Sequence, residues 1–209
     1  MPTTDALLTF IVAGLLLNLI PGPDVLYIVG RSLAQGRAAG IVSSLGIATG
    51  CLVHVAAATL GLSALMLALP HAYDVVRWVG AAYLVWLGVK ALLAKSSPLH
   101  VATPELASLW RVFRQGAITN ILNPKIAMFF LAFLPQFADA SRGALAPQIL
   151  FLGCLFVFNG FFICAGYALL AARLGDWLKS RWDIGTWLNR TTGVLFIGLG
   201  LRLALAPRE

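Results

Sequence analysis

Two related stretches of sequence decide the fold: residues 18–24 read NLIPGPD and residues 120–125 read NILNPK. Both stretches lie inside long apolar runs. A proline inside a helix removes one backbone hydrogen-bond donor and clashes with the carbonyl group four residues earlier, so it kinks or breaks the helix. The sequence therefore predicts one broken helix at Pro21, Gly22 and Pro23, and a second at Asn123 and Pro124.

The composition places these helices in a membrane. Of the 209 residues, 60% are hydrophobic and only 11% are charged, and the mean hydropathy is +0.88. A soluble domain carries about 25% charged residues, and a domain of this size has no core large enough to bury so many apolar side chains. We therefore expect an all-α polytopic membrane protein.

The apolar runs are long enough to count the membrane spans. A hydrocarbon layer about 30 Å thick requires about 20 residues of helix to cross it. Six stretches of the chain meet this requirement. The predicted transmembrane helices are 6–30, 41–68, 74–94, 113–137, 148–171 and 187–206.

The two proline motifs also belong to an internal repeat. Three short matches keep the same order in both halves of the chain, which is typical of a duplicated unit. The matching stretches are NLIPGP (18–23) with NILNPK (120–125), GCL (50–52) with GCL (153–155), and LGVK (87–90) with LGLR (199–202).

The repeat divides the chain into a first three-helix unit (1–94), a linker (95–112) and a second three-helix unit (113–206). Because three is an odd number, the second unit enters the membrane from the opposite side. The predicted architecture is thus two inverted three-helix repeats in which helices 1 and 4 are broken. Inverted repeats of this kind recur in secondary transporters, whose binding sites lie at broken helices near the bilayer midplane.

Basic residues set the predicted orientation. The chain has fifteen Lys and Arg against eight Asp and Glu, a net charge of +7. Ten of the basic residues fall in or beside the first, third and fifth loops, four fall on the other side, and Lys125 lies within a span. The positive-inside rule then makes the linker cytoplasmic and puts both termini on the periplasmic side. The same distribution argues against a nucleic-acid partner.

The ordered motifs resemble those of one protein family. PGPD at residues 21–24, the glycine-rich stretch over residues 36–50, and NILNPK at residues 120–125 are similar to those of the LysE/RhtB family of amino-acid exporters. The resemblance covers nearly the whole chain, from about Leu7 to Leu205. The motif residues that it marks are Pro21, Gly22, Pro23, Asp24, Asn123, Pro124 and Lys125.

The resemblance implies a function. Members of the family export amino acids or close derivatives across the bacterial inner membrane. We expect proton antiport, with a neutral substrate such as threonine, homoserine or leucine. The expected partners are the amino acid, protons and the lipid bilayer. A homodimer through the glycine-rich face is an option that the sequence leaves open.

The charges inside the spans suit an amino-acid ligand. Asp24 lies seven residues before Arg31, and Lys125 lies eleven residues after Arg114, which puts them about 10 Å and about 16 Å inside the same membrane face. Charged residues at such depth are usually paired and functional. An amino acid is a zwitterion, so we expect Asp24 to face its ammonium group and Lys125, helped by Asn123 and a half-helix N-terminus, to face its carboxylate.

Other roles for these two residues stay open. Asp24 can instead carry the coupling proton, or cap the half-helix that begins after Pro23. For Lys125 the alternatives are an ion pair or a cap on the C-terminus of the preceding half-helix. As a cap or in an ion pair, either residue would stabilise the break without touching the substrate.

Three further polar residues are candidates for the site. Asn18 and Asn120 occupy equivalent positions in the two repeats. Asparagines in membranes more often form hydrogen bonds between helices than bind a ligand. His54 lies in the middle of the second span, where it can relay protons. A neutral histidine bonded to a backbone carbonyl is an equally good reading of His54.

The glycines and cysteines of the spans have structural readings. Glycines at 36, 40, 46 and 50 allow helices to approach closely. Cys51 and Cys154 occupy equivalent repeat positions, so a thiol or electron carrier is one alternative function, although packing cysteines are favoured. A metal-ion exporter is another, but it would need several His, Asp or Glu ligands in the membrane. No enzyme motif, cofactor site or metal site is predicted.

Overall fold

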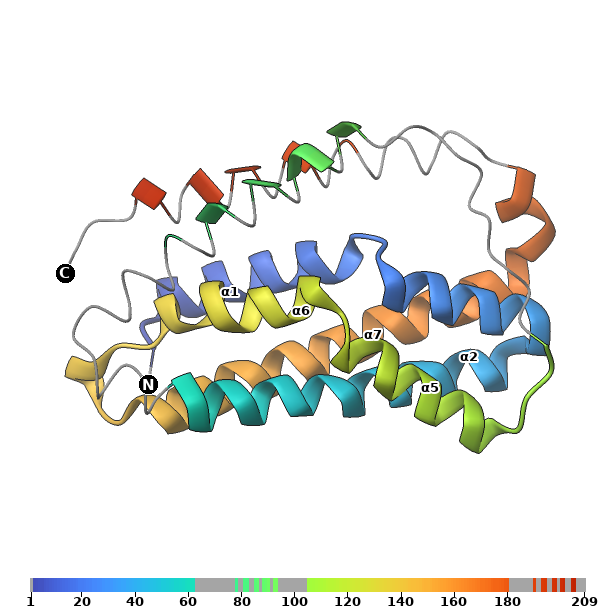
Figure 1. The fold of residues 1–209 in the computed structure, drawn as a ribbon, viewed down its shortest axis with the longest axis horizontal. Coiled ribbons are helices and arrows are strands. Elements are labelled where there is room, and N and C mark those ends of the chain that lie inside the picture. Colours follow the sequence, from blue (N-terminus) through green and yellow to red (C-terminus); the bar gives the residue numbers. More distant parts are fainter. Residues whose placement is uncertain are drawn as a thin grey trace.

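The computed structural model describes residues 2–62 and 105–180, together with isolated positions between 78 and 93 and between 190 and 205. The regular elements among these residues are all helices, and they run lengthwise in one elongated bundle (Figure 1). The predicted all-α class is confirmed for this part of the chain. The predicted third and sixth spans, 74–94 and 187–206, lie mostly outside the described residues.

The first proline motif interrupts the chain as predicted. Helix α1 (Thr4–Leu19) begins at the N-cap Thr3, whose hydroxyl accepts a hydrogen bond of 3.2 Å from the backbone N–H of Ala6. It ends before residues 20–22. Helix α2 (Pro23–Ala57) then begins with Gly22 as its N-cap and a proline at its first position. A proline is well placed there because the first N–H groups of a helix have no partner within it.

Helix α2 reverses direction at Gly36, where φ is 80° and ψ is −177°. In a straight helix, residues 32 and 40 would be about 12 Å apart. In the structure, a Cβ atom placed on Gly40 would lie only 3.2 Å from the Cβ of Ser32. Only glycine adopts this backbone conformation readily. Gly36 therefore makes the turn between the first span and the second, which continues into the π-helix η1 (Ala58–Leu62).

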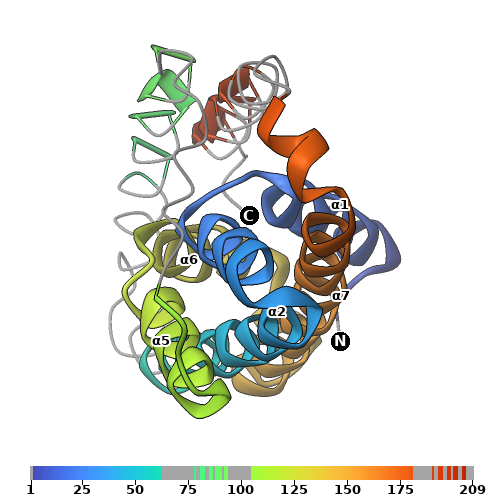
Figure 2. The same ribbon diagram turned by 90° about the vertical axis from the view of Figure 1, so that its right-hand side faces the viewer.

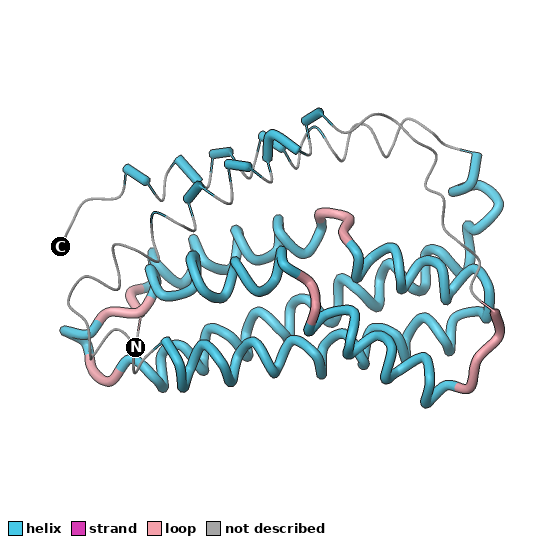
Figure 3. Tube along the Cα trace, in the orientation of Figure 1, coloured by secondary structure: helices cyan, strands magenta, loops and turns pink. Residues whose placement is uncertain are grey.

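The second proline motif also breaks a span as predicted. Helix α5 (Leu109–Ile121) has Ser108 as its N-cap and begins four residues before the predicted start at 113. Helix α6 (Pro124–Met128) follows at Pro124 and continues as η2 (Phe129–Phe133) and η3 (Leu134–Phe137). The two halves meet at an angle of 46°. Figure 3 shows both breaks as loops at mid-length in neighbouring spans.

The fifth span is longer than its apolar run indicates. After the short helix η4 (Ala140–Arg142), helix α7 extends over Leu145–Ser180, against a prediction of 148–171. Its first turn is fixed by the side chain of Gln148, whose amide donates to the backbone oxygens of Asp139 and Gly143 at 2.8 and 3.2 Å.

Length and hydropathy identify the membrane-crossing helices within the described part of the chain. Pro23–Gly61 and Leu145–Arg173 each pass as a span, and the bent pair Leu109–Ile121 and Pro124–Phe137 passes together. Because α2 turns back at Gly36, its first part continues the direction of α1 and completes the first span (Figure 1).

Glycines bring the second span against α5. Beta carbons placed on Gly46 and Gly50 would collide with the backbone carbonyls of Phe113 and Ala117, and one on Gly40 would collide with Ser32 and lie 2.8 Å from Ala168 of α7. The expected close approach is thus confirmed at these three glycines. The end-on view shows α2 between α5 and α7 (Figure 2).

We expect Gly46→Ala to lower the stability of the protein by about 1–3 kcal/mol, the usual cost of overpacking. The new methyl group would meet the backbone of Phe113, with the carbonyl carbon at 3.0 Å, and backbone cannot rotate away as a side chain can. Thermal unfolding in detergent measures the effect. Gly166→Ala is the matched control because nothing lies within 4 Å of its added Cβ; an equal loss in both variants would contradict this packing.

Aromatic side chains fill the bundle beyond the two breaks. Phe129 stacks on Phe156 with ring centroids 4.6 Å apart, and it also contacts Phe10 and Phe133 at 5.9 and 5.2 Å. All four rings are 3% exposed or less. The half of the bundle that holds α1 and η2 therefore has a closely packed apolar interior. The opposite half, which holds the Gly36 turn and the start of α5, combines two smaller apolar clusters with buried polar side chains such as Arg31 and Ser32.

Candidate functional site

The two breaks lie against each other, and a buried carboxylate joins them. Asp24 follows the first break, and its Oδ2 accepts hydrogen bonds of 2.8 Å from the amide of Asn120 and 2.9 Å from the amide of Asn123, both at the second break. Asp24 is 6% exposed. Its side chain makes no capping bond to its own helix, whose N-cap is Gly22. The structure therefore gives no support to the capping alternative for Asp24.

Lys125 makes the reciprocal connection from the second break to the first. Its ammonium group donates to the backbone oxygens of Leu17 and Ile20, at 3.3 and 3.0 Å. These carbonyls end α1, where the break removes their usual partners. Lys125 thus caps a half-helix C-terminus, as one alternative supposed, but it caps α1 and not the preceding half-helix α5.

Side chains from other helices partner the remaining freed carbonyls. The hydroxyl of Tyr167 in α7 donates to the oxygen of Leu19 at 2.7 Å. At the second break, Nε2 of His54 lies 3.0 Å from the oxygen of Asn120. Irregular backbone is tolerated at membrane depth where protein groups satisfy it in this way. Both breaks are consequently stable parts of the fold.

Asn123 has two roles at the second break. Its side-chain oxygen accepts a bond of 3.0 Å from the backbone N–H of Lys125, which makes it the N-cap of α6. Its amide nitrogen donates to Asp24. One asparagine therefore fixes both the start of the second half-helix and the carboxylate opposite, and it is 1% exposed.

A cavity lies at this junction, and the empty space in and around it, open solvent included, is about 430 Å³. Five polar side chains and ten other residues line it. The polar ones are Asn18, Asp24, Ser44, Asn120 and Lys125, and the others are Val25, Ile47, Ala48, Cys51, Ile126, Phe156, Val157, Gly160, Phe161 and Cys164.

Three polar atoms around this cavity are buried without a hydrogen-bond partner: Oδ1 of Asp24, Oδ1 of Asn120 and Nδ2 of Asn18. Buried polar groups normally have partners because an unsatisfied one costs about 1–3 kcal/mol. The first two atoms accept hydrogen bonds and the third donates them. Lys125 adds a donor, since an ammonium group has three N–H bonds and two are used.

The structure brings together four of the six predicted site side chains, and Asn123 lies directly behind them. Asn18, Asp24, Asn120 and Lys125 line the cavity. His54 does not, because its ring stacks on Phe130 with centroids 6.1 Å apart and its Nε2 lies on a backbone oxygen. His54 has the environment of a structural histidine, as the second reading of it supposed.

The cysteines are not arranged as the thiol-carrier alternative requires. Cys51 is buried and lines the cavity, whereas Cys154 is exposed, and both are free thiols. The second cavity cysteine is Cys164, which the repeat did not identify. Within residues 2–62, 105–180 and the isolated described positions, no group of three or more His, Cys, Asp or Glu is placed to hold a metal ion.

Sequence reasoning missed several residues around the site. Tyr167 caps the first break, and Ser44 lines the cavity from the second span. A polar network of Tyr27, Arg31 and Gln115 lies on the side of the Gly36 turn. One signal was available for the network: Asp24, Tyr27 and Arg31 are spaced three and four residues apart and so share one helix face.

The chain is similar to known efflux proteins over almost its entire length. A family model described as "LysE type translocator" matches residues 15–206. A homoserine/homoserine lactone efflux protein of Salmonella typhimurium is 32% identical over 198 residues, which cover 94% of this chain and 95% of that protein. A leucine efflux protein of Enterobacter sp. is 27% identical over 199 residues, covering 94% and 93% of the two chains.

Another relative has no stated substrate. An uncharacterized membrane protein of Vibrio cholerae is 31% identical over 199 residues, covering 95% of this chain and 96% of that one. No solved structure matches the chain.

Proposed function

The chain belongs to the LysE type translocator family, and we propose that it exports neutral amino acids from the cytoplasm through the cavity between its two broken helices. The observation that carries the proposal is the charge pattern of that cavity. Asp24 and Lys125 line the same space, and Asp24 keeps one carboxylate oxygen without a partner. An unpaired acceptor beside a buried cation is complementary to a zwitterion.

The two ends of the ligand bind to different atoms. The ammonium group is bound by Oδ1 of Asp24 and Oδ1 of Asn120, the two acceptors without partners. The carboxylate is bound by Nδ2 of Asn18 and by the remaining N–H of Lys125. The site and the ligand are then both neutral overall. Neutrality matters because an uncompensated charge is costly in a buried site.

The apolar part of the cavity selects the side chain of the substrate. Apart from Asp24, the described lining contains no carboxylate, and its largest members are Phe156, Phe161 and Ile47. A basic amino acid would need a second anion for its side chain. A neutral side chain needs only space and apolar contact, which favours leucine, threonine or homoserine. The named relatives act on homoserine, homoserine lactone and leucine.

The repeat gives a mechanism of alternating access. In this proposal the halves 1–94 and 113–206 are inverted repeats, related by an axis near the crossing of the two breaks, and they rock about the cavity. Export is driven by exchange for protons, and Asp24 is the carboxyl group placed to carry one. A proton on Asp24 would release the ammonium group of the substrate.

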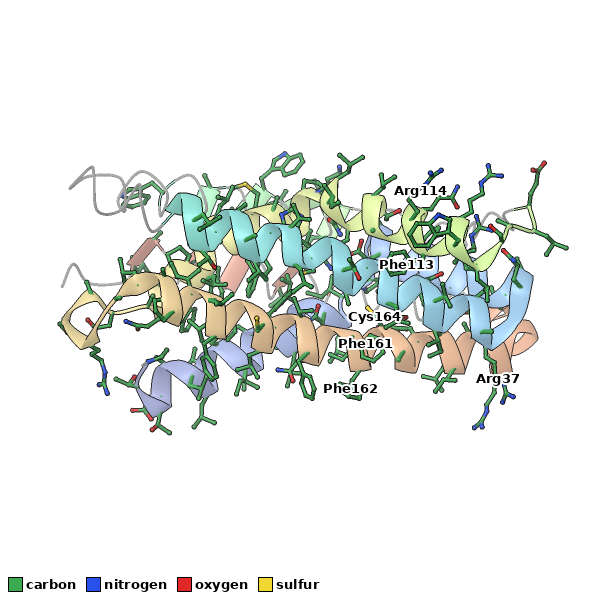
Figure 4. The ribbon with its side chains drawn as sticks, turned by 90° about the horizontal axis from the view of Figure 1, so that it is seen from below. Arg37, Phe113, Arg114, Phe161, Phe162 and Cys164 are labelled. Atoms are coloured by element: carbon green, nitrogen blue, oxygen red, sulfur yellow. The ribbon has the colours of Figure 1, made fainter. Side chains whose placement is uncertain are left out.

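The proposed location is the bacterial inner membrane with both termini periplasmic. Support comes from the basic end of the bundle: Arg37 lies beside the Gly36 turn and Arg114 in α5, both exposed and toward the same end (Figure 4). Exposed Arg111 and Arg173, near the start of α5 and in the last part of α7, add to it. By the positive-inside rule this end faces the cytoplasm.

Flux through proteoliposomes tests the proposal. The panel is labelled leucine, threonine, homoserine, lysine, arginine and cysteine, each with and without an imposed pH gradient. We expect movement of one or more of the neutral members, faster with the gradient, and none of lysine or arginine. Movement of the basic amino acids alone would contradict the substrate class, and a rate independent of the gradient would contradict proton exchange. Protein-free liposomes are the control.

A further inference from the structure

Arg31 is buried on the Gly36 side of the cavity without an anion beside it. It is 4% exposed. Its NH1 donates to the side-chain oxygen of Gln35 at 2.7 Å and to the backbone oxygen of Glu105 at 2.8 Å, and its NH2 donates to the side-chain oxygen of Gln115 at 2.7 Å. Its Nε has no partner. Among the described residues no Asp or Glu side chain pairs with it, although buried charges usually require one.

The position of Arg31 relates it to the substrate cavity. Arg31 is seven residues after Asp24, which on a helix is two turns, about 10 Å, and nearly the same face. Tyr27 lies between them on that face. Its hydroxyl donates to the oxygen of Val112 at 2.7 Å, and its ring lies 5.7 Å from the guanidinium carbon of Arg31. A line of polar side chains thus runs along α2 against α5, from the cavity to the basic end of the bundle.

The present hydrogen-bond partners of Arg31 are neutral oxygens, where a buried guanidinium group usually has an anion. A guanidinium group binds a carboxylate through two parallel N–H bonds, with a strength that amide oxygens do not reach. In this structure the oxygens of Gln35 and Gln115 occupy part of that fork, and Nε stays open. A carboxylate that displaced the two glutamine oxygens would satisfy the buried charge better.

We propose that Arg31 is a second substrate site, which binds the carboxylate of an amino acid entering from the cytoplasm before it reaches the cavity. In this proposal the network of Arg31, Gln35 and Gln115 is the closed form of the site. The inference rests on the proposed function, because that function supplies the zwitterionic ligand and makes this end cytoplasmic.

In this proposal, the same contacts keep the cytoplasmic entrance to the cavity closed. Gln35 donates to the oxygen of Ala107 at 2.8 Å and accepts from its N–H at 3.3 Å, so the segment before α5 is bonded to α2 at this point. Arg31 adds the bond to Glu105 of the same segment. When a carboxylate takes the guanidinium group, Gln35 and Gln115 lose that partner and the segment is released.

Transport measured from each face tests this site. Uptake into inverted vesicles presents the cytoplasmic face, and uptake into right-side-out vesicles presents the other. The probes are the neutral amino acid that moves fastest in the flux panel (leucine, threonine or homoserine) and its amide. The amide, used as a competitor, lacks the carboxylate. We compare the wild type with Arg31→Gln and Arg31→Lys. Arg37→Gln is the matched control, because it removes an exposed positive charge nearby.

For Arg31→Gln we expect KM at the cytoplasmic face to rise about ten- to a hundredfold, as the loss of a charge-assisted bond predicts. The inhibition constant of the amide should stay within about twofold of its value for the wild type, and KM at the opposite face should not change. Arg31→Lys keeps the charge without the fork, so its KM should lie between those of the wild type and Arg31→Gln. The KM of Arg37→Gln should match that of the wild type.

Two results would overturn the inference. An unchanged KM at the cytoplasmic face would remove Arg31 from substrate binding. If Arg31→Gln bound the amino acid and its amide more weakly by the same factor, Arg31 would be a purely structural contact. Failure of the proposed function looks different, because then the wild type itself would move none of the neutral members of the flux panel. The amount of each variant in the membrane shows that it has inserted.

Discussion

Asp24→Asn is expected to reduce efflux to the level of vesicles without the protein, at least a hundredfold below the wild type. Asparagine has the shape of aspartate but no charge, and one of its two polar atoms is a donor. Facing the ligand, that amide would oppose an ammonium group, which is also a donor. A charge-assisted hydrogen bond contributes about 1.5–3 kcal/mol, and the ammonium group would lose its buried counter-ion as well.

The rest of the site should tolerate this change. The amides of Asn120 and Asn123 can still donate to the oxygen of the new asparagine, in place of Oδ2 of Asp24. Insertion and folding should therefore be retained, and flux of the panel substrate is the measurement. Asp139→Asn, which changes a half-buried carboxylate in the connection between η3 and α7, is the control. Normal efflux by Asp24→Asn would remove Asp24 from both substrate binding and proton coupling.

The breaks were predictable because proline has a local effect. Pro21, Pro23 and Pro124 interrupt helices wherever they occur in an apolar run, so their positions in the sequence give their positions in the fold. The reciprocal contacts of Asp24 and Lys125 were predictable only in part. Counting residues from the basic ends put them at similar depth, but depth alone does not say which atoms meet.

The partners of these residues depended on the packing of distant helices. The bond from Lys125 to α1 joins residues 105 and 108 positions apart in sequence, and the bond from Tyr167 to Leu19 joins residues 148 positions apart. No local pattern encodes such pairs. The turn at Gly36 falls in the predicted connection between the spans 6–30 and 41–68, but the sequence did not indicate which residue makes it. Several glycines lie nearby, and only one of them has a positive φ among residues 23–57.

Arg31 shows why a charge count is an incomplete guide to topology. Its position directly after the predicted span 6–30 makes it one of the basic residues that mark the cytoplasmic side. It does lie toward the basic end, but it is buried and bonded within the bundle. Its exposed neighbour Arg37 serves equally well as a topology signal. Burial is what separates a residue that orients the protein from one that can bind a ligand, and burial is a property of the fold.

Lys125→Ala is expected to abolish transport and also to lower the stability of the protein. Removing the ammonium group leaves Asp24 as a buried carboxylate in a cavity whose described lining holds no other cation. It also leaves the oxygen of Ile20 without its side-chain donor, and the oxygen of Leu17 with only the backbone N–H of Ile20 at 3.3 Å. Breaking a buried ion pair costs on the order of 3–5 kcal/mol, and we expect a smaller loss here because Asp24 and Lys125 line one cavity but make their hydrogen bonds to other groups. Flux and thermal unfolding in detergent measure the two effects separately.

Lys125→Arg distinguishes a specific fit from a requirement for positive charge. A Cβ placed on Gly22 would lie 3.3 Å from Nζ of Lys125 and 3.6 Å from its Cε, so the lysine end is packed against the backbone of the first break. A guanidinium group is larger and planar, and it presents its donors in a fixed fork. We therefore expect Lys125→Arg to insert, to unfold at a higher temperature than Lys125→Ala, and to transport at less than a tenth of the wild-type rate. Wild-type flux through Lys125→Arg would mean that the site needs only a cation at this depth, and the contact with the end of α1 would then be incidental to transport.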